Sequence, residues 1–254
     1  MPQTKTFGFV LTSAEGKRLI AKGVAALPCV QQALAEGTII IGYGTTNGFI
    51  AEELTGQPID KGRYAAGIVA GGQWTVTDSD SRLPTIVLEK GTTSSTPWLE
   101  ALANFTADDV FIKGANAIDL EGNAGVLVGS PTAGTCGAAL GTVYASGAHL
   151  VVPVSLEKLI PSVPLAVQTL GISRLDECTG LKVGMYPMVG GEIITEVEAL
   201  ELLFDVEAVA VSAGGIGGSE GAIGLAVTGY PETIDEVKEL IDEIQGEAAL
   251  PDPR

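Results

Sequence analysis

A short apolar run that leads directly into a glycine-rich loop limits most strongly how this chain can fold. Residues 38–41 (Thr-Ile-Ile-Ile) are continuously β-branched, which is typical of a strand buried on both faces of a parallel sheet. The loop 42–48 (Gly-Tyr-Gly-Thr-Thr-Asn-Gly) follows, and a helical pattern then continues to Gly56. This order predicts an α/β fold with the loop at one edge of the sheet.

The same alternation of strand and helix continues along the chain. A capping box, Thr12-x-x-Glu15, predicts the start of the first helix, and a short second helix is expected before Gly37. Further strands are expected at 85–88, 110–113, 125–128 and 149–154, with helices at 97–104 and about 135–145. We therefore expect residues 1–189 to form a layered α/β domain with a mostly parallel sheet.

The pattern changes after Gly190. Strands are expected at 192–195, 208–212 and 222–228, with a helix through Leu203 and a last helix opened by the capping box Thr233-x-x-Glu236. Residues 190–247 are thus predicted to form a small α+β lobe, with 248–254 as a tail. The glycine-rich segment 214–221 is interpreted as a hairpin connection, with a lid as the alternative.

The charge balance excludes several classes of partner. The 254 residues include 14 Lys and Arg against 31 Asp and Glu, a formal net charge of −17. Nucleic acids and anionic membranes are poor partners, because binding them depends on many Lys and Arg side chains. A small anion would have to be held by backbone N–H groups and a few placed lysines.

The few cysteines and the single histidine carry little chemistry by themselves. Cys29, Cys136 and Cys178 are widely spaced and His149 is the one imidazole, so neither a metal site nor a disulfide framework is predicted, and no cofactor is expected. Cys136 is interpreted as a small buried helix residue, with a thiolate nucleophile as the alternative, and His149 as structural. We find no targeting or membrane-spanning pattern and expect a cytoplasmic homo-oligomer.

The loop after the first strand is the leading candidate for an anion site. Gly42 and Gly44 allow the backbone to approach a ligand, while Thr45 and Thr46 add hydroxyl donors at the start of a helix. The spacing G-x-G-x-x-x-G differs from the dinucleotide fingerprint, and no Walker motif occurs in the chain. A plain turn with Thr46 as the helix N-cap is the alternative.

Polar residues also follow two later strands and open one later helix. Lys113, Asn116 and Asp119 come after the strand at 110–113, and Glu157 and Lys158 come after the strand at 149–154. Parallel strands end at a common sheet edge, where ligands bind in open sheets. The alternatives are that Lys113 is a solvated strand end, that Asp119 belongs to a turn, and that Lys158 is a solvated helix lysine paired with Glu157 or an Asp. Another candidate donor set is Gly134 and Thr135, at the start of the helix near 135–145.

Taken in order, these segments resemble the superfamily of ribose-5-phosphate isomerase A, the CoA-transferases and the sugar-phosphate sensors. Residues 25–54 look like the pentose-phosphate isomerase opening, and 109–119 is similar to the superfamily's strand ending in Gly-Ala-Asp. Residues 149–161 resemble the Glu-Lys-x-x-Pro element of the lactate-utilisation branch. The isomerases, however, carry Asp-Gly-Ala-Asp where this chain has Lys-Gly-Ala-Asn at 113–116, which argues against pentose isomerisation.

Together these observations predict a protein that binds a small phosphorylated or carboxylated metabolite, of sugar-phosphate or CoA or folate type. If the chain is an enzyme, we expect isomerase or transferase chemistry with Asp119 or Glu157 as general base. The alternative is a non-catalytic sensor or assembly subunit that has lost the acid and base residues.

Overall fold

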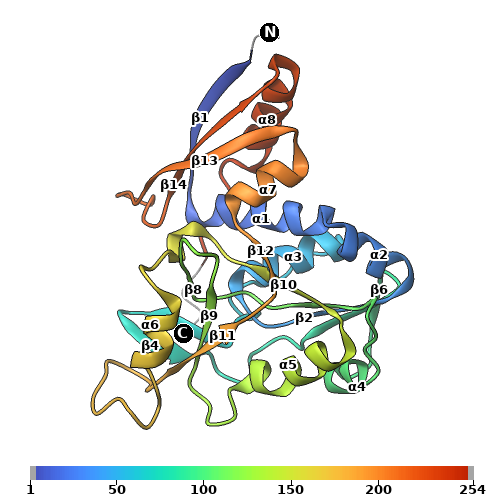
Figure 1. Cartoon of the computed structure of the whole chain (residues 1–254), viewed down its shortest axis with the longest axis vertical. Helices are drawn as coiled ribbons and strands as arrows, with labels where there is room; N and C mark the ends of the chain where they lie inside the picture. Colours follow the sequence, from blue (N-terminus) through green and yellow to red (C-terminus); the bar gives the residue numbers. More distant parts are fainter. Residues whose placement is uncertain (1–3, 251–254) are drawn as a thin grey trace.

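A six-stranded mixed sheet forms the centre of the computed structural model, which describes residues 4–250 (Figure 1). Its strand order is β12 (Glu192–Ile194), β10 (His149–Pro153), β7 (Val110–Ile112), β2 (Thr38–Ile41), β5 (Ile86–Glu89) and β6 (Thr92–Ser94). The first four strands are parallel, whereas β5 and β6 are antiparallel. The α/β class is confirmed, but the sheet is parallel only among its four strands β12, β10, β7 and β2.

A tight turn explains the antiparallel pairing of β5 with β6. The two turn residues, Lys90 and Gly91, have φ values of 49° and 73°. Two successive positive φ angles characterise the two-residue turns that join neighbouring antiparallel strands. A parallel pair would have needed a long crossover connection, for which this turn leaves no room.

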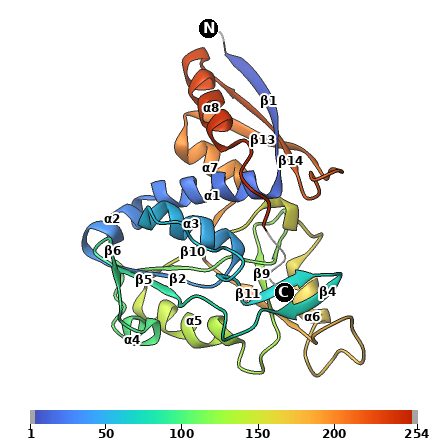
Figure 2. The ribbon, with the colours of Figure 1, turned by 180° about the vertical axis from the view of Figure 1, so that it is seen from behind.

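Helices cover both faces of the large sheet (Figures 1 and 2). The helices α1 (Ser13–Ala26), α2 (Pro28–Glu36) and α3 (Thr45–Thr55) cover one face, and α4 (Trp98–Ala103) and α5 (Gly134–Ser146) cover the other. Alternate residues of β2 enter two different cores: Ile39 and Ile41 pack on one side and Ile40 on the other, all fully buried. This burial on both faces is what the β-branched run predicts.

A three-stranded antiparallel sheet forms the small lobe, above α1 in Figure 1. Its order is β1 (Lys5–Leu11), β14 (Ile223–Gly229) and β13 (Val206–Ala213), and α7 (Glu196–Leu203) and α8 (Pro231–Ile244) accompany it. The first strand of the chain, β1, therefore belongs to the sheet of the small lobe and not to the large domain as predicted. The strand expected at 192–195 belongs to the large sheet and not to the lobe. The segment 214–221 joins antiparallel neighbours, as its interpretation as a hairpin connection requires.

A third group of elements lies beside the large sheet, around the labels β9, β11 and β4 in Figure 2. It consists of the sheet β11 (Gly184–Met188), β9 (Ala124–Val128) and β8 (Ala117–Ile118), the hairpin of β3 (Gly67–Ala70) and β4 (Gln73–Val76), the 3₁₀ turn η1 (Leu156–Lys158), and α6 (Val163–Thr169). Within residues 4–250, no helix combines the length and apolar character needed to cross a bilayer.

The two predicted capping boxes have different outcomes. Thr12 accepts the backbone N–H of Glu15, and the Glu15 side chain accepts the N–H of Thr12, so the first box is confirmed. The second is wrong, because α8 begins at Pro231 and Thr233 lies inside its first turn. Proline at the first helical position makes Tyr230 the N-cap, three residues before the predicted Thr233.

Two helical glycines provide a test of the packing between α1 and α7. A Cβ added at Gly23 of α1 would lie 2.6 Å from Ala199 Cβ and 2.8 Å from its Cα, whereas a Cβ at Gly141 of α5 would meet nothing within 4 Å. We expect Gly23→Ala to lower the free energy of unfolding by about 1–3 kcal/mol. Gly141→Ala, the matched control, should raise it by roughly 0.5–1 kcal/mol because alanine favours the helix. Urea unfolding of both variants measures the difference, and equal effects would contradict this packing.

Candidate functional site

A pocket of about 940 Å³ opens at the carboxyl ends of β2, β7 and β10. The backbone pairing of the sheet continues into the loops that follow these strands. Gly42 N donates to Ile112 O at 2.9 Å, and Lys113 N donates to Val151 O at 2.9 Å. The loops after the strands are therefore fixed side by side at one sheet edge, where open α/β sheets bind their ligands.

The pocket brings together most of the residues that the sequence singled out. Those that line it are Gly44, Thr45, Thr46, Lys113, Asn116, Gly134, Thr135, Glu157 and Lys158. A further wall of the pocket contains the segment 65–71, which includes β3, and Arg82. Sequence reasoning missed that wall, because the short hairpin alternates buried and exposed residues weakly and contains two consecutive glycines.

The start of α3 presents donors to this pocket. Its N-cap is Gly44, which has no side chain to satisfy the first backbone N–H groups, so the alternative of Thr46 as N-cap is wrong. Thr46 is 2% exposed and lines the pocket, and its Oγ1 has no hydrogen-bond partner among the described residues. A buried hydroxyl without a partner is costly unless a bound group satisfies it.

Gly42 lies behind the pocket wall instead of lining it. A Cβ at this position would lie 3.1 Å from Lys113 Cδ and 3.2 Å from Ile112 O. The glycine therefore leaves room for the lysine side chain to pass toward Tyr43 and Gly114. Gly42 therefore contributes to the site by leaving space for the Lys113 side chain. In this loop, Gly44 and the residues after it line the pocket and Gly42 does not.

Two pocket lysines are bonded to carbonyl groups. Lys113 Nζ donates to Tyr43 O at 3.3 Å and to Gly114 O at 3.1 Å, and Lys158 Nζ donates to Ala115 O at 2.9 Å. Within residues 4–250, neither ammonium has a carboxylate oxygen within 4.0 Å. Burial lowers the pKa of both side chains, and the charges of Lys17 and Lys113 help to bring the pKa of Lys158 to about 8.

Glu157 pairs with a different lysine from the one next to it. Lys17, on α1 and 3% exposed, donates to Glu157 Oε1 at 2.6 Å, so the alternative in which Lys158 pairs with Glu157 is wrong. Burial opposes the charged form of Glu157, but Lys17, Ser13 and Lys158 together outweigh it, and the pKa of the carboxyl lies below its ordinary value. Lys17 lies on the apolar face of α1 with Ile20 and Val24. A charged residue at an apolar position of a helix is a sequence signal that could have marked Lys17 as a buried, paired residue.

Asp119 serves a turn and does not reach the pocket. Its carboxylate accepts the backbone N–H groups of Glu121 at 3.1 Å, Asn123 at 2.9 Å and Val163 at 2.9 Å. Burial would raise the pKa of this carboxyl, but the hydrogen bonds lower it below its ordinary value. The geometry thus matches the turn that was the alternative for Asp119, and Glu157 is left as the carboxylate at the pocket.

Three other polar residues have structural positions. Asn116 Oδ1 accepts Leu127 N at 2.9 Å, which ties the loop after β7 to β9. Cys136 is 1% exposed, and burial raises the pKa of its thiol, in agreement with a small buried helix residue. His149 is exposed at the start of β10, at the opposite end of that strand from the pocket.

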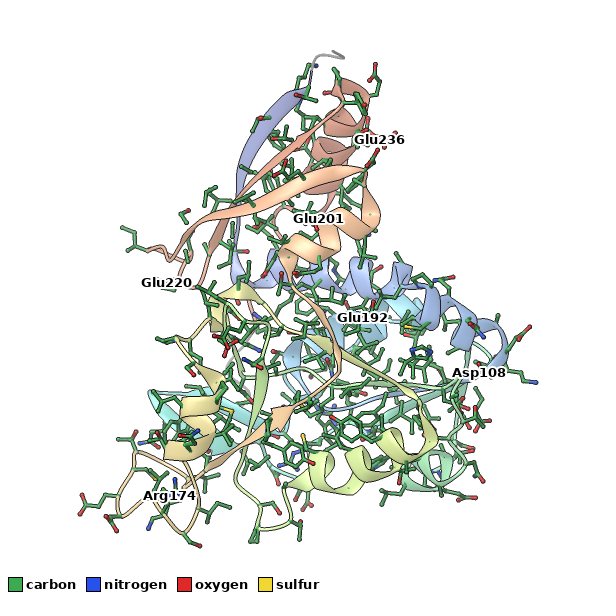
Figure 3. All side chains as sticks on the ribbon, in the orientation of Figure 1. Asp108, Arg174, Glu192, Glu201, Glu220 and Glu236 are labelled. Atoms are coloured by element: carbon green, nitrogen blue, oxygen red, sulfur yellow. The ribbon has the colours of Figure 1, made fainter. Side chains whose placement is uncertain are left out.

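The electrostatics of the pocket differ from those of the rest of the chain. Among the described residues, its lining contains four cationic side chains, Lys17, Arg82, Lys113 and Lys158, against one carboxylate, Glu157. Acidic side chains are spread over both lobes, as the labelled Asp108, Glu192, Glu201, Glu220 and Glu236 illustrate (Figure 3). No cluster of His, Cys, Asp and Glu within residues 4–250 could hold a metal ion.

Compared with protein-family models, curated proteins and solved structures, the chain has no significant match.

The turn at Asp119 can be tested by its contribution to stability. Asp119→Ala leaves buried N–H donors without an acceptor and should lower the free energy of unfolding at pH 7 by about 1–3 kcal/mol. Because the pKa of Asp119 is depressed, its contribution is present above its unfolded value of ~3.9 and is lost as the pH falls through the folded value. Urea unfolding at pH 7 and at pH 3 measures this loss.

The matched control is Asp176→Ala, at an exposed position. It should change the free energy of unfolding by less than about 0.5 kcal/mol. A similar effect of the two substitutions at pH 7 would contradict the role of Asp119 in the turn.

Proposed function

We propose that the chain binds a small phosphorylated or carboxylated metabolite in the pocket at the carboxyl ends of β2, β7 and β10. The observation that carries the proposal is the convergence there of Lys113 and Lys158, bonded only to carbonyl groups among the described residues, with the unpartnered Thr46 hydroxyl. An anion would supply a negative charge for the two lysines and an acceptor for the Thr46 hydroxyl. The pocket volume is within the range of small-molecule sites, about 300–1,000 Å³.

The start of α3 supplies a second attraction for the same anion. Gly44 leaves the first backbone N–H groups of this 11-residue helix without a side-chain cap. Free N–H groups and the helix dipole favour a negative group at this position. The phosphate or carboxylate would thus be placed near Thr45 and Thr46, with Lys113 beside it, while Lys158 would face another part of the ligand.

The state of Glu157 favours binding over the carboxylate chemistry of isomerases and transferases. A general base needs a pKa near the working pH and a free carboxylate oxygen. The pKa of Glu157 is depressed and the carboxylate is held by Lys17, while Asp119 is occupied in a turn. A metabolite sensor or assembly subunit is therefore the second candidate. Membership of the sugar-phosphate superfamily, a cytoplasmic location and a homo-oligomeric state stay predictions.

A ligand series tests the binding proposal. Inorganic phosphate, ribose 5-phosphate, CoA and folate should be compared by thermal unfolding, since a ligand at 100 times its Kd adds about 2.7 kcal/mol. For a chain of this size that corresponds to a rise in Tm of roughly 5–10 °C. Lys113→Met should weaken binding of the best ligand about ten- to hundredfold. The exposed Lys5→Met is the control, and failure of every compound to raise Tm would contradict the proposal.

Thr46→Val separates a ligand contact from a structural role. Valine has nearly the same shape without the unpartnered hydroxyl, so the free protein should become more stable by about 1 kcal/mol. The same substitution should weaken anion binding at least about fivefold, because the hydroxyl donor is lost. Thr93→Val, at an exposed position on β6, should do neither. Lower stability together with unchanged affinity would assign Thr46 to the fold alone.

A further inference from the structure

Lys158 presents an amine to the pocket with little internal hydrogen bonding. Its Nζ donates to one group among the described residues, the carbonyl of Ala115 at 2.9 Å. Lys17 is held by Glu157 and by the Ser13 carbonyl at 3.1 Å, and Lys113 bridges two carbonyl groups. Of these three pocket lysines, Lys158 is therefore the one whose amine has the fewest contacts to give up in order to move toward a ligand.

The charged groups around Lys158 come from three elements and one loop. Burial is the largest influence, and it lowers the pKa of Lys158 to about 8 together with the positive charges of Lys17 on α1 and Lys113 after β7. Glu157 on η1 and Glu196 on α7 oppose this effect. Glu196 is itself buried with a raised pKa, and Glu157 is paired with Lys17. An appreciable fraction of Lys158 is consequently the free amine near neutral pH, the form in which lysine is a nucleophile.

We propose that Lys158 is a nucleophilic lysine that condenses with the carbonyl carbon of an aldehyde or ketone ligand and forms an imine. This rests on the proposed function, because the anion site at Thr45, Thr46 and Lys113 would hold the negative group of the ligand while its carbonyl group meets Lys158. The ligand class is thereby narrowed from small anions to anions that also carry a reactive carbonyl, such as open-chain sugar phosphates and 2-oxo acids.

The reaction balances without an added oxidant or reductant. The Lys158 ammonium first loses a proton, and the amine nitrogen then forms a bond to the carbonyl carbon while the carbonyl oxygen gains a proton. The carbinolamine loses its oxygen as water with a second proton, and the nitrogen retains one hydrogen. Ammonium plus carbonyl thus gives a protonated imine plus water. The positive charge beside the carbon withdraws electrons from neighbouring bonds, so the imine would supply the activation that the occupied carboxylates do not.

Reductive trapping tests the proposal on the full chain. Pyridoxal 5′-phosphate, an aldehyde with a phosphate, is added at pH 7.5 for short times, cyanoborohydride reduces any imine, and peptide mass spectrometry locates the label. Lys158 should be labelled at least about tenfold faster than the exposed Lys5, because the lowered pKa of Lys158 leaves an appreciable fraction of its side chain as the free amine. The rate at Lys158 should reach half its maximum near pH 8.

Two variants and a matched alcohol distinguish imine formation at Lys158 from anion binding in the pocket. Lys158→Arg keeps the positive charge and should abolish the fast labelling. Lys113→Met removes a nearby positive charge, so the midpoint of the pH profile at Lys158 should rise. Pyridoxine 5′-phosphate, the matched alcohol, should raise Tm without labelling. If the alcohol stabilises the protein but Lys158 reacts no faster than Lys5, the imine is overturned and anion binding stands. If neither phosphate compound binds or labels Lys158, the imine proposal is overturned, and the ligand series above decides separately whether anion binding stands.

Discussion

The parallel backbone ladder of β12, β10, β7 and β2 is the constraint on which the candidate site depends. Just beyond the strands, Gly42 N, Lys113 N and Val154 N each donate to a carbonyl of the neighbouring strand at 2.9 Å. Each loop therefore begins at the same level as the next, and none can shift without breaking a buried hydrogen bond. The side chains decide what the pocket holds, but the backbone pairing decides where the pocket lies and which segments share it.

The pocket combines groups that are satisfied within the protein and groups that are not. Lys17 and Glu157 neutralise one another, and the side-chain oxygen of Asn116 accepts a backbone N–H group of β9. Among the described residues, Lys113 and Lys158 donate to carbonyl groups but have no carboxylate partner. The Thr46 hydroxyl has no hydrogen-bond partner there at all. Burying ammonium groups without counter-charges is unfavourable for folding, which is why their presence at a cavity points to a ligand.

The sequence predicts those parts of the site that depend on local pattern. Strand periodicity locates the ends of β2, β7 and β10, and their parallel pairing brings Thr46, Lys113 and Lys158 to one edge. Contacts between distant segments are not local: Lys17 and Glu157 are 140 residues apart, and β1 pairs with a strand more than 200 residues later. Phe7, Phe9 and Leu11 do alternate as a half-buried strand should, yet nothing near them in the sequence shows where that strand pairs.

The contrast between a cationic pocket and a chain of net charge −17 also bears on how fast an anion arrives. At long range an approaching anion meets the field of the whole acidic surface, whereas at the pocket itself cationic side chains outnumber carboxylates. Salt screens interactions beyond a Debye length of about 8 Å at physiological ionic strength, so it weakens the distant repulsion more than the partly buried attraction. If the pocket binds an anion as we propose, the association rate of that anion should therefore rise with ionic strength, the opposite of an electrostatically steered enzyme.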